Sequence, residues 1–363
     1  MAHNEQERDM IHPVLKPVFA LLLLLFQLGC DGILLQPTWN GCPDGPRCEP
    51  DMQVDASPVM DAETVDAKTV DMSTIDAALL PDMGIEPIVP CPLETEIVGA
   101  NEITWVCIEG GEFTMGRNDG GDNQGPAHPV RVPTFWMTKS EITVAQYRSC
   151  VSDVETPCVP PNVDIFSSNY RSERDREAYP MDGVNINAVS GFLRFLGDEA
   201  RLPTESEWEF AASGRGTQSP YPWGDSVKDC ESVQTNLIGG ETQCELGGAR
   251  PVCSGDDISV YGLCDLMGNL SEWTADDYHG RYDCSDGIDI TGCAVGSIER
   301  APDDGSSWTA TRASAGRVVR GGSFSFGEGD TQTHRVSIWA RRLKQPDISE
   351  SDLGFRVVRT TMP

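Results

Sequence analysis

The stretch RLPTESEWEFAA, residues 201–212, carries the clearest structural signal in the chain. Thr204 is followed three residues later by Glu207, a spacing that is typical of a capping box at the first turn of a helix. Pro203 disfavours an earlier start, because the residue before a proline is pushed out of the helical region. The sequence therefore predicts a helix that begins after Thr204 and packs on the core through Trp208.

Short apolar segments separated by turn residues surround this stretch. Strands are expected at 105–108 and 135–137, because both are short apolar runs bounded by turn residues. A helix is expected at 143–151, and a second one at 188–199 with Asn187 as its N-cap. The rest of the chain reads as loops, strands and glycine turns. The pattern predicts an α+β domain with little regular secondary structure.

Nine segments resemble the sulfatase-modifying-factor, or formylglycine-generating-enzyme, family and follow one another in the family's order. They are 110–116 (GGEFTMG), 141–143 (EIT) with Tyr147, 180–184 (PMDGV), 201–212, 221–225 (YPWGD), 261–263 (YGL), 265–273 (DLMGNLSEW), 320–324 (RGGSF) and 353–356 (LGFR). The resemblance covers residues 95–361. It implies one domain of the formylglycine-generating-enzyme fold, a C-type-lectin-like superfold with irregular loops around a small sheet. It does not fix the function, because one fold hosts many different sites.

The cysteine pair on which the family's chemistry depends is absent. In this family, formylglycine formation resembles an oxidation at copper(I) that is bound by two cysteine thiolates. The two cysteines lie five residues apart, shortly after the Gly-Gly-Ser motif. Here these positions fall on Phe326 and near Thr331, and no cysteine follows Cys293. Soft Cu(I) prefers thiolate ligands, so copper is not expected. No catalytic residue is predicted, and Ser323, Phe326 and His334 remain as a candidate groove.

The resemblance also implies a calcium site. Asp265, Gly268, Leu270 and Glu272 match the ligands of a family site residue by residue. Two carboxylates with two backbone carbonyls between them offer several oxygen atoms to a hard cation, and the role of the ion would be structural. The alternative is that Glu272 and Trp273 are a buried core pair.

A second family calcium site would begin at Asn236 and Leu237. The position of its distal aspartate falls on Cys244 or Glu245. The sequence therefore supplies this second site with only part of its ligands.

The thirteen cysteines indicate an oxidising compartment, in which disulfides persist. Hairpin-like spacings predict the local bridges Cys42–Cys48, Cys91–Cys107, Cys150–Cys158 and Cys284–Cys293. A further quartet, whose pairing cannot be read from the sequence, consists of Cys230, Cys244, Cys253 and Cys264. A zinc site made of four thiolates is the weaker reading, because paired C-x-x-C spacing is missing.

The N-terminus, residues 1–29, is interpreted as a lipoprotein signal peptide. The apolar run at 18–28 is too short to span a bilayer but fits a signal-peptide core. It ends in QLGC at 27–30, which resembles a bacterial lipobox, so Cys30 is expected to carry lipid. The protein would then sit in the cell envelope, on the inner or the outer membrane. The alternative is an ordinary signal peptide followed by an incidental cysteine and a secreted chain.

Residues 30–90 are expected to form an acidic, disordered stalk. Between Asp31 and Pro90 twelve acidic residues face only two basic ones. Such a segment repels itself and has no aromatic cluster to bury, so it should stay extended and lift the following domain off the membrane. The sulfatase-modifying-factor-like domain would then occupy 91–363.

The net charge and the missing thiolates limit the classes of function that are expected. A net charge of −30 argues against nucleic acid as a partner. A non-catalytic binding or structural module with a protein, peptide or glycan ligand is favoured, and the loops 153–176 and 279–317 would form part of its binding face. Tyr278, Tyr282 and Trp308 are candidates either for ligand contacts or for packing. The alternative is a formylglycine-type oxidase acting on a protein cysteine, which requires distant thiols such as Cys284 and Cys293 to meet near Ser323.

Overall fold

The computed structural model describes residues 87–363 except for 162–167, 172–174, 227, 230–231, 236, 239–241, 244–246, 285–298, 311–315 and 326–336. Residues 1–86, which include the predicted signal peptide and most of the predicted stalk, lie outside this part of the chain, as do the predicted site residues Cys30, Asn236, Phe326, Thr331 and His334. Within it, no helix is both long and apolar enough to cross a membrane.

Helices and strands of the described part are short. The helices are α1 (Val144–Val151), α2 (Ile186–Leu196) and α3 (Glu205–Ser213), with 3₁₀ turns at Ala100–Glu102 and Asp122–Gln124. The strands are β1 (Glu96–Val98), β2 (Thr104–Ile108), β3 (Gly111–Met115), β4 (His128–Val132), β5 (Phe135–Thr138), β6 (Leu237–Ile238), β7 (Thr242–Gln243), β8 (Ser271–Asp277), β9 (Arg317–Arg320), β10 (Arg341–Lys344), β11 (Leu353–Gly354) and β12 (Val358–Arg359). The prediction of an α+β domain with little regular structure is confirmed.

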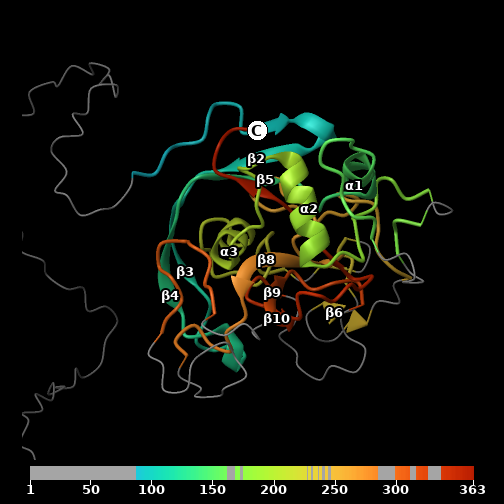
Figure 1. Cartoon of the computed structure of the whole chain (residues 1–363). Coiled ribbons are helices and arrows are strands. Elements are labelled where there is room, and N and C mark those ends of the chain that lie inside the picture. The colour runs from blue at the N-terminus through green and yellow to red at the C-terminus, as the bar shows by residue number, and fades with distance from the viewer. Residues whose placement is uncertain are drawn as a thin grey trace, which may run out of the picture. The chain divides into compact units, whose positions relative to one another are not determined.

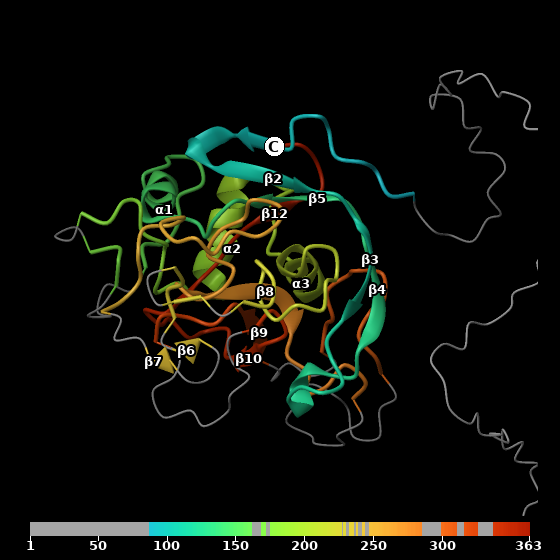
Figure 2. The same cartoon turned by 180° about the vertical axis from the view of Figure 1, so that it is seen from behind.

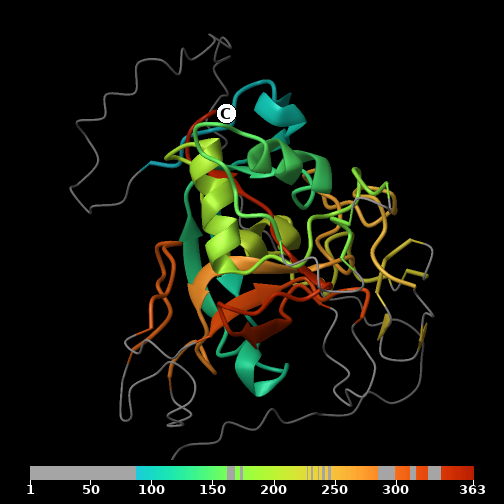
Figure 3. The same cartoon turned by 45° about the vertical axis from the view of Figure 1, so that its right-hand side comes forward.

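Two four-stranded sheets organise the domain. One has the strand order β1-β2-β5-β12 and the other the order β10-β9-β8-β11, and β3 and β4 form a separate antiparallel pair. Helix α3 lies between the two sheets and contacts β3, β4, β8 and β9 (Figures 1 and 2). Helix α2 runs from the first sheet toward the second (Figure 3). The first sheet joins the two ends of the described chain, because β12 pairs with β5.

The start of α3 agrees with the sequence. Thr204 Oγ1 accepts a hydrogen bond from Glu207 N at 3.1 Å, and Glu207 Oε2 accepts one from Thr204 N at 2.9 Å. The helix ends at Gly214, whose φ of 59° lies in the left-handed region that glycine tolerates. Every residue of α3 is buried, including Trp208. The helix is therefore a central element of the core rather than an amphipathic surface helix.

The other expected elements agree with the structure to different degrees. The strands and α1 differ from their predicted bounds by at most one residue. The prediction for α2 is wrong at both ends, because the helix starts at Ile186 and stops at Leu196. Asn185, not Asn187, is the N-cap, since its Oδ1 accepts a hydrogen bond from Ala188 N at 3.0 Å. Gly197, with φ 101°, then ends the helix.

Disulfides fix several loops. Those that join described residues are Cys91–Cys107, Cys150–Cys158 and Cys253–Cys264. The first two confirm predicted pairs, and the third joins two members of the quartet that the sequence left open. Cys284 is also disulfide-bonded, while Cys42, Cys48, Cys230, Cys244 and Cys293 lie outside the described residues. Each bridge contributes roughly 2–4 kcal/mol by restricting the unfolded chain.

The buried carboxyl of Asp182 should make the stability depend on pH. Burial raises its pKa from 3.8 to about 7, although Ser168 Oγ and Asn169 N donate hydrogen bonds to it. Between these values the folded chain holds a proton that the unfolded chain has released, so the free energy of unfolding falls as pH rises through this window. The full loss is about 4 kcal/mol, at about 1.4 kcal/mol for each of the roughly three pKa units of this shift.

Asp182→Asn should flatten this part of the pH profile. An amide does not ionise, and its remaining oxygen can still accept from Ser168 and Asn169. Urea denaturation at pH 5 and pH 8 measures the difference for both proteins. Equal pH dependence of the two would show that Asp182 does not hold the proton.

Candidate functional site

The Gly-Gly-Ser turn follows directly on β9. Gly321 and Gly322 have φ values of 88° and 71°, which favour glycine, and a Cβ on Gly321 would lie 3.1 Å from a backbone carbonyl. Ser323 is buried, and its Oγ donates a hydrogen bond to Asp352 Oδ2 at 2.9 Å. Ser325 Oγ donates to the same carboxylate. The serine of the family motif is thus held in place by the carboxylate of Asp352.

The rest of the candidate groove lies outside the described residues, since neither Phe326 nor His334 is placed. All cysteines that the structure describes are in disulfides, namely Cys91, Cys107, Cys150, Cys158, Cys253, Cys264 and Cys284. Cys284 was one of the two thiols that an oxidase would need near Ser323. Its participation in a disulfide removes it as a free copper ligand.

A buried ion pair lies at the end of the segment 265–273. Both oxygens of Glu272 contact Arg356, with Oε1 at 2.6 Å from Nη2 and Oε2 at 2.7 Å from Nε. Trp208 Nε1 donates a further hydrogen bond to Oε2 at 2.8 Å. Both charged side chains are fully buried. The bidentate geometry compensates for the cost of removing two charges from water.

Two more carboxylates surround this pair. Asp265 is buried and accepts a hydrogen bond from Cys253 N at 2.6 Å. Glu141 is buried and accepts from Leu270 N at 3.1 Å. Burial, and then the charges of neighbouring carboxylates, raise the pKa of Glu141 well above its usual range. Burial is also the largest cause that raises the pKa of Asp265, to about 6. With Glu272, three buried carboxylates thus face one buried guanidinium, Arg356.

This arrangement fits a divalent cation. A carboxylate offers about four lone-pair sites, and the three donors to Glu272 leave one of them on Oε1. The turn that would carry the backbone ligands is tight, because Asp265 and Gly268 have φ values of 57° and 85°. The surplus of buried negative charge favours a bound cation over an empty site. Both Glu272 and Trp273 are buried, so the core-pair reading and the calcium reading are compatible.

A second buried charge network was missed by the sequence reasoning. Glu205 of α3 accepts from Arg341 Nη2 and Nε at 2.6 and 2.7 Å, and Glu209 pairs with Arg320. All four side chains are buried. The signal was present in α3, since acidic residues on a helix that is buried all round require cationic partners. The identity of the partners could not be read, because Arg341 is 136 residues away from Glu205.

The aromatic residues of the predicted binding face mostly serve packing. Tyr282 and Trp308 are buried. The ring of Tyr282 contacts His128, and Trp308 stacks on His279 with 3.6 Å between ring centroids. Of the two readings that the sequence left open, the structure supports packing for these residues.

Comparison with known proteins places the fold in a family. Residues 95–361 match the model of the sulfatase-modifying factor enzyme 1-like domain. The chain is 27% identical over 322 residues to inactive C-alpha-formylglycine-generating enzyme 2 of Mus musculus, covering 77% of this chain and 92% of that protein. It is 26% identical over 299 residues to the formylglycine-generating enzyme of Thermomonospora curvata, covering 69% of this chain and 91% of that enzyme.

Solved structures share the fold. The structure of PvdO from Pseudomonas aeruginosa matches with a TM-score of 0.56 at 21% identity, covering 74% of this chain and 98% of that one. Treponema denticola variable protein 1 matches with a TM-score of 0.50 at 22% identity, covering 75% of this chain and all of that one. The family model matched over residues 95–361 shows that the chain belongs to the sulfatase-modifying factor enzyme 1-like domain family.

Proposed function

We propose that this chain is a membrane-anchored, extracytoplasmic protein whose formylglycine-generating-enzyme-like domain is a non-catalytic binding or structural module. One observation carries the proposal: the cysteines of the described residues are all disulfide-bonded, and no cysteine follows the Gly-Gly-Ser turn in the sequence. Soft copper(I) therefore lacks the two thiolates that the family's oxidation needs. The relatives include both active and inactive enzymes, so their names do not decide the question.

The chain should form no aldehyde on a C-x-P-x-R peptide in the presence of copper(I) and oxygen. Mass spectrometry of the peptide measures this, with an active formylglycine-generating enzyme as positive control. The matched variant Phe326→Cys/Thr331→Cys should bind one equivalent of copper(I) that the natural chain does not bind, because it restores two thiolates five residues apart. Aldehyde formation by the natural chain would show that the domain is an oxidase.

The remaining features of the sequence support display at a membrane. Cys30 would carry the lipid, and the acidic segment 30–90 would separate the domain from the bilayer. A ligand of the module would be a protein, a peptide or a glycan. The loops 153–176 and 279–317 are the proposed contact region.

Calcium is the proposed structural cofactor of the domain, held by Asp265 and Glu272 with the carbonyls of Gly268 and Leu270. When bound, it would supply positive charge to a place where buried carboxylates exceed guanidinium groups. It would also hold the 265–272 turn in its folded conformation.

Calcium should therefore raise the melting temperature after treatment with a chelator. An ion at a hundred times its dissociation constant stabilises the fold by about 2.7 kcal/mol. Asp265→Ala, which removes both side-chain oxygens, should abolish most of this response, whereas Asp182→Asn, which alters a different buried acid, should retain it. Differential scanning fluorimetry measures all three proteins. An unchanged calcium response in Asp265→Ala would exclude Asp265 as a ligand.

A further inference from the structure

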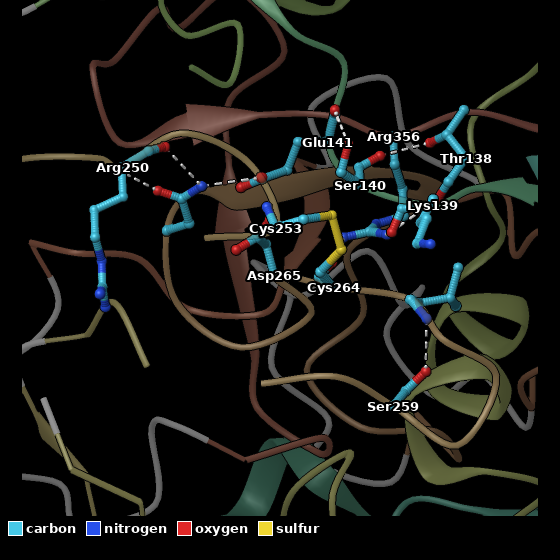
Figure 4. Close-up of a disulfide and its surroundings, with 12 residues drawn as sticks. Thr138, Lys139, Ser140, Glu141, Arg250, Cys253, Ser259, Cys264, Asp265 and Arg356 are labelled. Atoms are coloured by element: carbon cyan, nitrogen blue, oxygen red, sulfur yellow. Dashed lines mark hydrogen bonds between the residues drawn. A yellow bond between two sulfur atoms is a disulfide. The ribbon is translucent and has the colours of Figure 1, made fainter. Parts of the chain in front are cut away.

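A disulfide and a buried carboxylate meet beside the Glu272–Arg356 pair. The two sulfurs of Cys253–Cys264 and a carboxylate oxygen of Asp265 all lie within 4.8 Å of one another. Figure 4 shows Asp265 and Arg356 close to this disulfide. Cys253 is an exposed residue, whereas Cys264 and Asp265 are buried. Solvent therefore reaches one end of the bridge, and the other end faces the interior.

We propose that reduction of Cys253–Cys264 creates a zinc site whose protein ligands are the two thiolates and the carboxylate of Asp265. A dithiol reductant transfers two electrons and two protons: the S–S bond breaks, two thiols form, and the reductant closes to its own disulfide. Zn²⁺ then displaces the two thiol protons, which pass to solvent. A water molecule completes the tetrahedron, as in other zinc sites with three protein ligands.

The dimensions suit zinc. With Zn–S distances near 2.3 Å, two sulfurs on one tetrahedral ion lie about 4 Å apart. This separation fits within the 4.8 Å that already encloses the three ligand atoms. Since the disulfide holds the sulfurs closer than that, binding needs only a small outward shift of the exposed residue Cys253. Two soft sulfurs and one oxygen favour Zn²⁺ over Ca²⁺ or Mg²⁺, which require oxygen ligands.

The charge of Asp265 supports a cation at this position. Its carboxylate accepts one backbone hydrogen bond, from Cys253 N, and makes no ion pair with any side chain of the described residues. The side chain is buried, so its ionised form lacks full compensation. A zinc ion would supply the missing positive charge. The zinc site stands whether or not calcium binds.

Zinc binding by the reduced full chain tests the proposal. The purified protein is treated with dithiothreitol, freed of it by anaerobic gel filtration, and titrated with Zn²⁺ against a chromogenic chelator in calcium-free buffer. We expect the reduced chain to bind one equivalent of zinc at least tenfold more tightly than reduced Cys253→Ala/Cys264→Ala. The matched variant Cys150→Ala/Cys158→Ala lacks a different disulfide and should still bind this equivalent of zinc. The cysteines outside these two disulfides are the same in all three proteins, so they cannot cause the difference.

Two further measurements separate metal binding from a folding defect. Co²⁺ in place of zinc should give the reduced natural chain sulfur-to-cobalt charge-transfer bands that exceed those of reduced Cys253→Ala/Cys264→Ala. Asp265→Asn, which keeps both cysteines, should bind zinc at least tenfold more weakly after reduction. Equal zinc affinity and equal cobalt spectra of the reduced natural chain and the double cysteine variant would overturn the proposal.

Discussion

Arg356→Met should lower the free energy of unfolding by about 3–5 kcal/mol, because it leaves the buried carboxylate of Glu272 without its ion-pair partner. The guanidinium donates two hydrogen bonds to Glu272, at 2.6 and 2.7 Å, and both side chains are fully buried. Glu141 and Asp265 add negative charge nearby, so these neighbouring side chains do not offset the loss. The melting temperature should fall by about 10 °C, at about 2–4 °C per kcal/mol for a domain of this size.

Two comparison variants distinguish the effect of an unpaired buried charge from the effect of losing an arginine side chain. Arg356→Met/Glu272→Leu removes both charges and should recover much of the loss, because a buried pair can be replaced by apolar groups at little cost. Arg215→Ala breaks an exposed pair with Glu109 and should cost no more than about 1 kcal/mol. Chemical denaturation of the four proteins gives the values. If Arg356→Met lies within about 1 kcal/mol of the natural chain, the pair does not stabilise the fold as described.

The sequence predicted those parts of the fold that depend on neighbours in the chain. The capping box of α3 joins Thr204 and Glu207, only three residues apart, so its hydrogen bonds are readable from spacing alone. The disulfide Cys150–Cys158 closes a similarly short loop. The start of α2 was missed because Asn185 and Asn187 are both good caps, and only the packing of the helix decides between them.

The parts that were not predicted depend on contacts between distant segments. The family-like motifs contained Arg320 and Arg356, but they did not identify these residues as partners of Glu209 and Glu272. The two pairs span 111 and 84 residues. The order of strands in the sheets also depends on contacts between distant segments, since β12 pairs with β5, from which most of the domain's sequence separates it. Local propensity contains no information about such pairings, whereas the resemblance to a family carries it indirectly.

In the candidate site, too, the sequence indicated some residues, whereas others depend on contacts between distant segments. The resemblance named Asp265 and Glu272 as cation ligands, and both lie in a buried cluster with excess negative charge. The contribution of Glu141 could not be anticipated, because it reaches the 265–273 segment through hydrogen bonds to Asn269 and Leu270 over more than 120 residues. The sequence thus indicated two residues of this buried cluster, whereas the charges around them depend on contacts that only the fold makes.

Cys30→Ser should move the chain from the membrane fraction to the soluble fraction, which is the largest change expected in its location. Each buried CH₂ of an acyl chain contributes about 0.8 kcal/mol to membrane binding, so stable anchoring takes two or more chains and is lost without them. Cys42→Ser alters a cysteine of the stalk and should leave the protein in the membrane fraction. Mass spectrometry of the N-terminal peptide should find acyl groups on Cys30 in the natural chain and in Cys42→Ser.

An unprocessed leader could itself hold the variant at the membrane, so a second pair of chains is needed. In these a general secretory leader replaces residues 1–29, and one of the two also carries Cys30→Ser. Both should be soluble, because neither presents the lipobox QLGC. If the Cys30→Ser chain with this leader still sediments with membranes, the lipid anchor is refuted, since attachment would then reside in the folded domain or the stalk.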